Sequence, residues 1–440
     1  MDVSENPFFH RGPIRQPAYF FNREEETAHL LALLRNLQNV AILGQRRIGK
    51  TSLLFHLARP ETYRRAGLVE ETNIFTYVDG QELGELDEAG TRGFLAKQIL
   101  NAVPFEADQE IHSPELKHHD FRNLIEQSTV HGLTLFLLLD EFEALAANPF
   151  LSPRFFSSLR ALSSQFNLVF VTASYRSLFD LTYARADTLS SPFFNTFAHF
   201  NLGLFTESAA AGLIHSMVEK AGLALPANAI QRIVALAGPH PFFLQMAAYH
   251  ACEALAEAGD EAIKEKLWEQ RFMVEARPHF EYYWNHLSPE SQYALAALPF
   301  ARPGGAPPLD ILQEAALVRR VSGGWSYLSP ALEVFVRRQS VPDLLQYGPF
   351  VMDLAARQAG GSGGSFKITK TEFDTLAYLI QNAERVVSPE ELESALWGDE
   401  YVDDPERVRA VIKSLRKALG DGSVYLATKW GEGYILQQPV

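Results

Sequence analysis

The sequence predicts an α/β core built on a parallel sheet, then a helical lid, a winged helix and a separate C-terminal winged helix-turn-helix domain. Two observations predict the core. A glycine-rich loop lies between an apolar run and a helical run, and further apolar runs alternate with helical stretches in the N-terminal half. Such alternation is typical of a parallel sheet that helices cover on both faces. A third observation, two later segments in which helices precede a hairpin, predicts the winged helices.

The glycine-rich loop matches the pattern G-x-x-x-x-G-K-[ST] at every fixed position, and it reads Gly44-Gln45-Arg46-Arg47-Ile48-Gly49-Lys50-Thr51. Its glycines let successive N–H groups point inward as an anion nest at a helix N-terminus. Lys50 would reach the β and γ phosphates, and the Thr51 hydroxyl would hold Mg²⁺. The loop and the following Ser52 are therefore predicted to bind ATP or ADP.

Composition sets limits on the class of protein. The 440 residues favour two to four domains, and a net charge of -14 argues against the whole chain binding nucleic acid or anionic membranes nonspecifically. The single cysteine, Cys252, excludes an internal disulfide and a cysteine-based zinc site. The first residues lack the pattern of a secretion signal, and the longest apolar run, Leu133 to Leu139, is too short to span a bilayer. We expect a soluble, cytoplasmic protein.

The N-terminal segment from Asn6 to Ile14 combines aromatic residues with turn formers. This composition predicts an ordered strap across a domain instead of a regular element. A strap of this kind could cover a purine ring, and Arg11 is its candidate nucleotide contact.

The apolar run 133–139 ends in Asp140-Glu141. A carboxylate at the C-terminal end of a buried strand beside the phosphate loop can hold Mg²⁺ through its water shell. An adjacent glutamate can orient or deprotonate the attacking water. Asp140 is therefore the predicted metal ligand and Glu141 the predicted catalytic residue, although many strands simply end at their first charged pair.

A fourth predicted strand, 167–174, ends in Ser174-Tyr175-Arg176. At this edge of the sheet Ser174 could sense the γ-phosphate, and Arg176 could stabilise charge on it, in cis or across a subunit contact. The alternative for Arg176 is an ordinary surface arginine.

These patterns divide the chain into five predicted parts. They are the ATPase core with its strap (1–205), the helical lid (206–262), the internal winged helix (263–345), a flexible linker rich in glycine and serine (346–365) and the C-terminal winged helix-turn-helix effector (366–440).

The C-terminal part carries a basic stripe on its predicted third helix and a predicted hairpin wing. A basic stripe beside a wing suits entry into a major groove and contact with phosphates. The alternative is a solvated helix face. The candidate DNA-binding residues are Arg407, Arg409, Lys413, Arg416, Lys417, Thr428 and Lys429.

Residues from about 6 to 340 resemble the STAND-type signal-transduction ATPases, near the archaeal-type ATPases and the origin-recognition-like AAA+ proteins. The resemblance lies in Phe21-Asn22-Arg23-Glu24, the phosphate loop, Leu137-Leu138-Leu139-Asp140-Glu141 and the Gly238-Pro239-His240-Pro241 turn. It implies that Pro241 packs near the adenine, and that an ADP-bound resting monomer opens and self-associates with ATP. Gly238 and Pro241 are separated by two residues here, where the family usually has one.

The C-terminal part is similar to the effector domain of winged-helix response regulators. The matching stretches are Thr369-Lys370-Thr371-Glu372-Phe373, Arg385-Val386-Val387-Ser388, Ser414-Leu415-Arg416-Lys417-Ala418-Leu419-Gly420 and Gly431-Glu432-Gly433-Tyr434. Trp430 and Ser414 stand where that family commonly has basic residues, and Glu432 where it has an apolar one. No receiver domain precedes this part, so the ATPase would take the place of that switch.

Together these features predict an ATP/ADP-dependent switch, with slow Mg²⁺-dependent hydrolysis, that couples nucleotide state to DNA binding and transcription regulation. Two alternatives remain open. One is a signalling or defence scaffold whose winged helices bind protein partners, and the other is an origin-recognition-like DNA-loading ATPase.

Overall fold

Five parallel strands form the sheet at the centre of the N-terminal unit, in the order β2-β3-β4-β1-β5. Their bounds are β1 Asn39–Leu43, β2 Asn73–Asp79, β3 Thr134–Asp140, β4 Leu168–Ser174 and β5 Phe197–Asn201. The parallel sheet is confirmed, with a fifth strand, β5, that the sequence analysis did not identify. Strands β3 and β4 are buried almost throughout because helices cover both faces.

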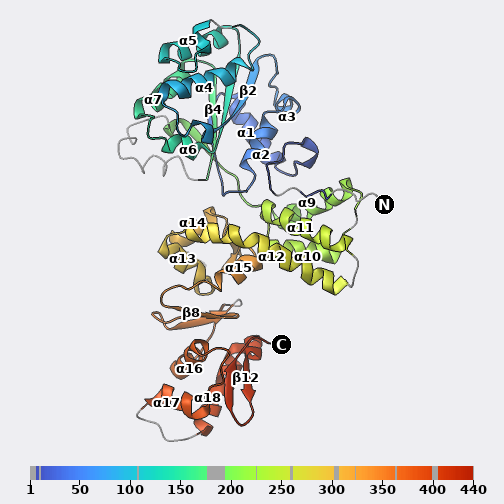
Figure 1. Cartoon of the computed structure of the whole chain (residues 1–440), viewed down its shortest axis with the longest axis vertical. Helices are drawn as coiled ribbons and strands as arrows, with labels where there is room; N and C mark the ends of the chain where they lie inside the picture. Colours follow the sequence, from blue (N-terminus) through green and yellow to red (C-terminus); the bar gives the residue numbers. More distant parts are fainter. Residues whose placement is uncertain are drawn as a thin grey trace. The chain divides into compact units, whose positions relative to one another are not determined.

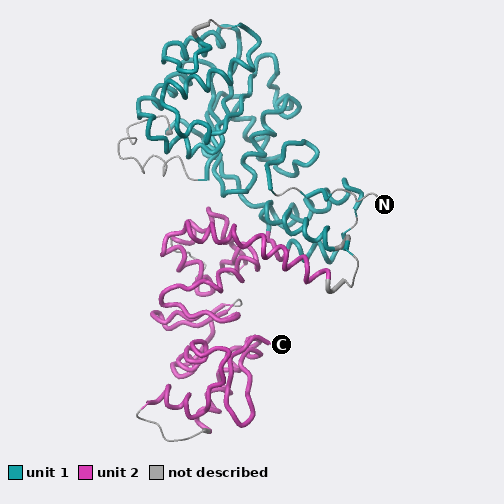
Figure 2. Tube along the Cα trace, in the orientation of Figure 1, with its two compact units in different colours: residues 1–234, 239–258 teal, residues 235–238, 259–440 magenta. Residues whose placement is uncertain are grey.

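The computed structural model describes residues 6–8, 11–106, 109–175, 194–223, 225–257, 261–301, 307–322, 324–361, 364–398 and 405–439. The chain divides into two units, coloured separately in Figure 2. The first comprises 1–234 and 239–258, and the second comprises 235–238 and 259–440.

The two faces of the central sheet carry different helices because successive strand residues point to opposite faces. On one face Val40 and Ile42 of β1 pack with leucines of α1 and α2, while on the other Ala41 packs with residues of α4, α5 and α7. The helices of this unit are α1 Glu24–Arg35, α2 Lys50–Leu57, α3 Pro60–Tyr63, α4 Glu88–Leu100, α5 His118–Val130, α6 Phe142–Ala147 and α7 Pro153–Gln165.

Strand register places the candidate site at one edge of the sheet. Asp79 at the end of β2 lies opposite Asp140 at the end of β3, and Leu43 at the end of β1 lies opposite Ser174. In parallel sheets ligands bind outside these carboxyl ends.

After the sheet the chain forms the predicted helical lid, with α9 Glu207–Lys220, α10 Ala227–Ala237 and α11 Pro241–Ala256. Helix α11 begins with proline at its first position, where the missing N–H costs nothing. The His240 side chain accepts a hydrogen bond from the Phe242 N–H and caps the helix.

The second unit begins with the predicted internal winged helix. Ser288 caps α13 by accepting a hydrogen bond from the Ser291 N–H. The elements are α12 Glu261–Asn285, α13 Pro289–Ala296, the short 3-10 helix η7 Leu298–Phe300, α14 Pro307–Glu314, the antiparallel strands β6 Val318–Val321 and β7 Gly324–Tyr327, and α15 Pro330–Val336.

The expectation of a flexible linker over 346–365 is wrong. This segment contributes to a four-stranded antiparallel sheet in the order β11-β10-β9-β8, with β8 Leu344–Tyr347, β9 Phe350–Asp353, β10 Gln358–Gly361 and β11 Gly364–Ser365. Composition favoured flexibility, yet the glycines permit close packing. A Cβ at Gly360 would lie 2.7 Å from the Gly364 carbonyl oxygen and 3.0 Å from the Phe300 ring.

The C-terminal part forms three helices and a wing, as predicted. Thr369 and Glu372 make a capping box at the start of α16. The elements are α16 Lys370–Gln381, α17 Pro389–Trp397, α18 Pro405–Leu419 and the antiparallel pair β12 Leu426–Lys429 and β13 Gly433–Leu436.

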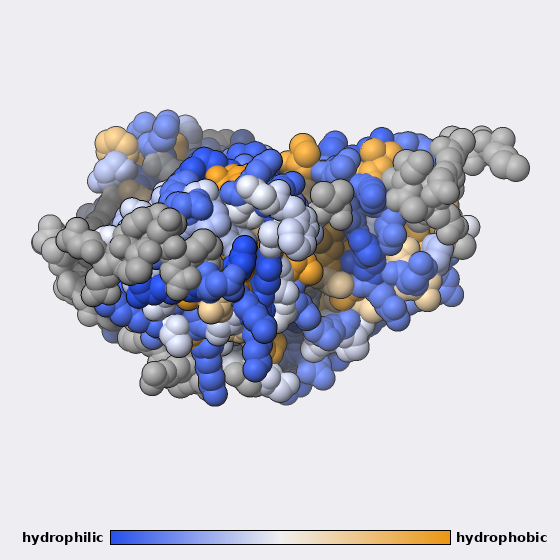
Figure 3. Space-filling view, turned by 90° about the horizontal axis from the view of Figure 1, so that it is seen from below, coloured by the Kyte–Doolittle hydropathy of each residue, from blue (hydrophilic) through white to orange (hydrophobic). Residues whose placement is uncertain are grey.

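The described surface is mainly polar on the face drawn in Figure 3, where hydrophobic residues are scattered among hydrophilic ones. Within the described ranges, the structure contains no helix that is both long and apolar enough to cross a membrane.

We expect Asn39→Ala to loosen the central sheet. The buried Asn39 side chain accepts a hydrogen bond from the Phe170 N–H of β4 (2.9 Å) and bonds to Ser163 of α7 (3.1 Å). A buried donor left without a partner costs about 1–3 kcal/mol. Hydrogen exchange of the β1 and β4 amides should accelerate accordingly. Ser163→Ala, which keeps the Phe170 bond, is the control, and equal protection in the two variants would contradict this account.

Candidate functional site

The loop between β1 and α2 adopts a conformation that its two glycines allow. Gly49 has φ 107°, in the left-handed region that favours glycine. A Cβ at Gly44 would lie 2.8 Å from the Leu202 carbonyl oxygen, so only glycine fits without displacing backbone. The loop therefore has the strand-loop-helix setting that a phosphate nest requires.

Lys50, the first residue of α2, reaches back over the loop. Its Nζ donates hydrogen bonds to the carbonyl oxygens of Gly44 (2.8 Å) and Gln45 (3.2 Å), and the residue is buried. Burial lowers the pKa of Lys50, and the nearby carboxylates of Glu143 and Glu141 partly oppose this shift. The ammonium group thus stands between the phosphate loop and a set of acids.

Asp140 is held in a defined orientation at the end of β3. The Tyr77 hydroxyl donates a hydrogen bond to Asp140 Oδ2 (3.1 Å), and the Glu141 N–H donates to Oδ1 (3.0 Å). The side chain is only 2% exposed. Burial, followed by Asp140 itself, raises the pKa of the Tyr77 hydroxyl, which keeps that group as a hydrogen-bond donor.

Glu141 has a left-handed backbone, with φ 44° and ψ 43°, immediately before α6. A glutamate in this region carries strain, which is common at functional sites. Gly80, after β2, comes very close to this turn. A Cβ at Gly80 would lie 2.6 Å from the carbonyl oxygens of Asp140 and Glu141.

Glu143 is an acid that the sequence analysis missed. Burial, together with Glu141, raises its pKa to about 7, whereas Lys50 lowers it. Its Oε2 is buried without a hydrogen-bond partner in the described structure. The signal in the sequence is its position two residues after Glu141 at the start of a helix, which places both acids beside the same loop.

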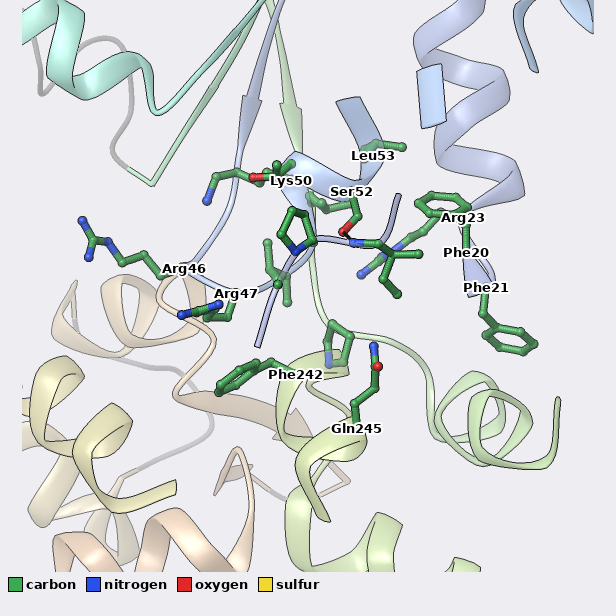
Figure 4. A pocket seen from close by; sticks show the side chains of 18 of the residues that line it. Phe20, Phe21, Arg23, Arg46, Arg47, Lys50, Ser52, Leu53, Phe242 and Gln245 are labelled. Carbon is green, nitrogen blue, oxygen red and sulfur yellow. Dashed lines mark hydrogen bonds between the residues drawn. The ribbon is translucent and has the colours of Figure 1, made fainter. Parts of the chain in front are cut away.

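A cavity of about 310 Å³ opens beside the loop, between the loop and α11 (Figure 4). Figure 4 shows Phe242 and Gln245 of α11 across from Arg46 and Arg47 of the loop. The polar part of the lining includes Arg46, Arg47, Gly49, Lys50, Thr51, Ser52 and Glu141. The apolar part includes Phe20, Phe21, Phe205, Leu213, Pro241 and Phe242. This cavity offers cations and N–H groups together with an apolar surface.

The N-terminal segment covers the loop as a strap. The Ile14 N–H donates to Ser52 Oγ (2.9 Å), and the Phe20 ring stacks on His56 of α2 with centroids 3.9 Å apart. Burial lowers the pKa of His56 to about 4, so this imidazole is neutral at pH 7. A neutral ring can stack here without carrying an unpaired buried charge.

Two arginines near the strap have different roles. Arg47 Nη1 donates to the Arg11 carbonyl oxygen (3.2 Å), and its guanidinium lies 5.2 Å from the Phe242 ring centroid. The Arg11 side chain lies over the Tyr249 ring (5.9 Å) and lines a neighbouring cavity of about 350 Å³. Arg11 thus contacts the loop through its backbone, and its side chain points to a different cavity from the one beside the phosphate loop.

The predicted γ-phosphate residues are only partly described. Ser174 is fully buried at the end of β4, and its carbonyl oxygen accepts a hydrogen bond from the Gly44 N–H (3.2 Å). Arg176 lies outside the described residues. Arg46 lies over the ring of Tyr175, 5.3 Å from its centroid.

The candidate DNA-binding residues on α18 and the wing fall into two groups. Lys413, Lys417 and Lys429 are exposed, as is Arg409, which pairs with Glu406. The others make intramolecular contacts. Arg416 donates from Nη2 to the Leu426 carbonyl oxygen and to Thr428 Oγ1, each at 2.8 Å, and the Arg407 guanidinium stacks on the Trp397 ring at 3.9 Å.

The wing tip differs in character from its basic surroundings. Trp430 is 94% exposed and follows Lys429 at the end of β12. The structure thus places a large aromatic ring at the wing tip, beside the exposed lysine.

Comparison with known families separates the same two parts. Residues 130–304 match the family Novel STAND NTPase 2, and residues 363–436 match the family Transcriptional regulatory protein, C terminal. The chain carries a STAND NTPase domain and a regulatory winged-helix domain. The phosphate loop lies N-terminal to the matched part of the NTPase domain.

Curated relatives match the regulatory winged helix. The uncharacterized transcriptional regulatory protein YclJ of Bacillus subtilis is 35% identical over 94 residues, covering 21% of this chain and 41% of that protein. The transcriptional regulatory protein PrrA of Mycobacterium tuberculosis is 33% identical over 100 residues, covering 22% of this chain and 43% of its own length. The chain therefore spans less than half the length of these relatives.

Solved structures match the longer N-terminal part. The Walker-type ATPase of Pyrococcus abyssi superposes with a TM-score of 0.54 at 17% identity, covering 74% of this chain and 99% of that one. The ORC2 protein of Aeropyrum pernix, in ADPNP and ADP complexes, gives 0.51 at 13% identity, covering 76% and 96%. At these identities the likeness establishes the fold of the NTPase domain and its attached helices.

We expect Gly80→Ala to displace the acidic end of β3. The added Cβ would meet two backbone oxygens, and overpacking of this kind costs typically about 1–3 kcal/mol. Thermal unfolding of the full chain, followed by circular dichroism, measures the loss. Gly84→Ala is the matched control, because a Cβ there meets only the Gln81 carbonyl oxygen at 3.5 Å. Equal melting of the two variants would contradict the close approach.

Glu143→Gln should change how stability depends on pH. The pKa of Glu143 is raised to about 7 in the folded protein, from an ordinary value of 4.5. The folded state therefore binds more protons than the unfolded state between pH 4.5 and 7, and stability falls as pH rises through this window. The full effect is on the order of 3 kcal/mol.

The variant lacks this titration, so its stability relative to the wild type should improve from pH 5 to pH 8. Thermal unfolding at both values measures the difference. Glu82→Gln, at an exposed glutamate in the nearby 3-10 turn, is the control. The assignment fails if Glu143→Gln and Glu82→Gln show the same pH dependence.

Proposed function

We propose that the chain is an ATP/ADP-dependent switch whose NTPase domain controls DNA binding by the regulatory winged helix. One observation carries this proposal: a cavity lined by a phosphate loop, Glu141 and apolar side chains occurs in the same chain as a winged helix with exposed lysines. Nucleotide binding and DNA binding are thereby joined in one molecule.

The nucleotide would bind with its phosphates in the loop and its base against the lid. Lys50 would exchange its bonds to the Gly44 and Gln45 carbonyl oxygens for bonds to phosphate oxygens. Pro241 and Phe242, at the start of α11, supply an apolar surface for the purine. Both Arg46 and Arg47 line the cavity and add positive charge where phosphates would lie.

Thr51 and Asp140 fit a magnesium site by the chemistry of their oxygen atoms. Mg²⁺ is usually held by one or two protein oxygens together with waters and phosphate oxygens. Asp140 is already oriented by the Tyr77 hydroxyl and by the Glu141 N–H. When bound, the ion would neutralise charge on the phosphates.

Glu141 would orient the attacking water and take up its proton. The neighbouring Glu143 keeps the local charge low because the burial that raises its pKa favours its neutral form. We expect slow hydrolysis, which suits a switch that times a state. Ser174 and Arg176 remain candidate γ-phosphate contacts.

On the DNA side, the exposed Arg409, Lys413 and Lys417 would enter the major groove or contact phosphates. Arg416 would act indirectly, because its hydrogen bonds to Leu426 and Thr428 fix the wing against α18. Lys429 would contact the backbone from the wing. We further propose that the ATP-bound form self-associates, which would pair two winged helices on DNA.

The test is DNA affinity in the two nucleotide states. The full chain is titrated with DNA from its neighbouring promoter, in ADP and in a nonhydrolysable ATP analogue. We expect different dissociation constants in the two states for the wild type. Lys50→Ala should bind nucleotide at least about tenfold more weakly, since hydrogen bonds to charged groups contribute about 1.5–3 kcal/mol, and should lose the difference. Lys97→Ala, at an exposed lysine of α4, is its control.

The same titration separates DNA recognition from a protein scaffold. Lys413→Ala with Lys417→Ala should reduce the salt dependence of binding by about two units of slope. Lys367→Ala with Lys370→Ala removes the same charge from exposed positions outside α18, the proposed recognition helix. This control should leave the slope nearly unchanged. Absence of DNA binding in both nucleotide states would refute the proposal and favour the scaffold.

A further inference from the structure

The four-stranded sheet β8–β11 contacts both winged helices of the second unit. In Figure 1 it is drawn between α13–α15 of the internal winged helix and α16 of the regulatory domain, and all of these elements belong to the same unit. The segment expected to separate the two domains is therefore part of a packed layer that touches each of them.

The central strand β9 is buried along its whole length, and its two faces serve different partners. Phe350 and Met352 point into the core of the regulatory domain, where they pack with residues of α16 and α18. Asp353 belongs to the opposite face by strand alternation. It accepts a hydrogen bond from the hydroxyl of Tyr293 on α13 and one from the Ala356 N–H (2.7 Å).

The contact to the internal winged helix has a second, apolar part. Helix η7 packs against β10 and β11. The Phe300 ring of η7 lies so close to Gly360 that a Cβ there would come within 3.0 Å of it. A hydrogen bond from Tyr293 to the buried carboxylate of Asp353 and an aromatic ring over a glycine thus join the sheet to the internal winged helix.

The contact to the regulatory domain is broader. Strand β8 packs on α16, and the Tyr347 hydroxyl donates to Glu384. The Phe350 ring meets Tyr425 edge to face, with centroids 5.6 Å apart. Gly348 lies against the same tyrosine, since a Cβ there would be 2.8 Å from its ring. The sheet and the regulatory helices therefore share one core.

We infer that this sheet is a rigid joint that makes the regulatory domain move with the internal winged helix, with Tyr293 and Phe300 as its positioning residues. The consequence of this inference rests on the proposed function: a change of nucleotide would move the internal winged helix and the regulatory domain together. The sheet leaves Lys413 and Lys417 of the recognition helix exposed, so within the second unit it does not act by covering them.

The first test measures rigidity without any ligand. Spin labels are placed at Arg338→Cys and Gln381→Cys, two exposed positions on either side of the joint, in a Cys252→Ala background of the full chain. Pulsed electron paramagnetic resonance should give one narrow distribution of distances between the two labels. Tyr293→Phe combined with Phe300→Ala should broaden this distribution. If the double variant does not fold, Tyr293→Phe alone, which removes one oxygen atom, is measured in its place.

The second test measures coupling as the ratio of DNA dissociation constants in ADP and in the ATP analogue. Allosteric ratios typically lie at roughly 5–150-fold. The joint variants should bring this ratio to about 1–2 while nucleotide affinity stays unchanged. Tyr378→Phe is the matched control, because it removes a tyrosine–carboxylate bond to Glu391 (2.8 Å) inside the regulatory domain. It should shift both affinities equally and keep the ratio.

The outcomes separate the joint from the switch. A broad distance distribution in the wild type overturns the rigid joint. So do joint variants that keep both a narrow distribution and the wild-type ratio of DNA dissociation constants. A wild-type ratio of one overturns nucleotide switching instead, and the distance distributions then decide the joint independently.

Discussion

Backbone proximity at the carboxyl edge of the parallel sheet is the constraint on which the N-terminal site depends. Parallel strands bring the ends of β1, β2 and β3 to one edge of the sheet. The backbone segments at this edge approach one another closely only at glycines, which lack a side chain. Gly44 lets the phosphate loop pass the Leu202 backbone, and Gly80 lets the end of β2 pass the turn at Glu141. A Cβ at Gly44 would push the loop away from Leu202, and a Cβ at Gly80 would push the end of β2 away from the turn at Asp140 and Glu141.

That closeness concentrates charge in a place with little water. Lys50 is buried beside Glu141 and Glu143. Burial lowers the pKa of Lys50, whereas these carboxylates raise it, and burial raises the pKa of Glu143, whereas Lys50 lowers it. Burial favours the neutral form of every group, while each charged neighbour of opposite sign restores the ion. The site therefore combines acids with the cations Lys50, Arg46 and Arg47. A bound metal ion would add positive charge beside the acids.

Local patterns in the sequence identified the residues whose roles depend on neighbours along the chain. The phosphate loop and the acidic end of β3 follow from spacing alone, and the structure has each of the corresponding elements. Glu143 was missed because its significance lies in burial and in its distance to Lys50. Likewise the spacing that made Arg416 a candidate DNA contact does not reveal its bond to the wing, because its partner Thr428 lies in a different element.

The same limit explains the incorrect linker. A glycine-serine run has little intrinsic preference for a strand, so its conformation is set by what it packs against. Phe350 and Ala359 lie in a core with residues of α16 and α18, and Gly360 lies against the Phe300 ring of η7. Nothing within the segment itself reveals those partners.

The division of β9 between two partners also fixes where a foreign effector could be grafted onto this ATPase. A graft joined at the glycine-serine run would cut between β10 and β11 and leave Phe350 and Met352 without their hydrophobic core. The workable junction lies between α15 and β8, so that the sheet travels with the effector. Even there, the incoming sheet must offer Tyr293 an acceptor. Exchange of effectors thus depends on the face of β9 that carries Asp353 more than on α18.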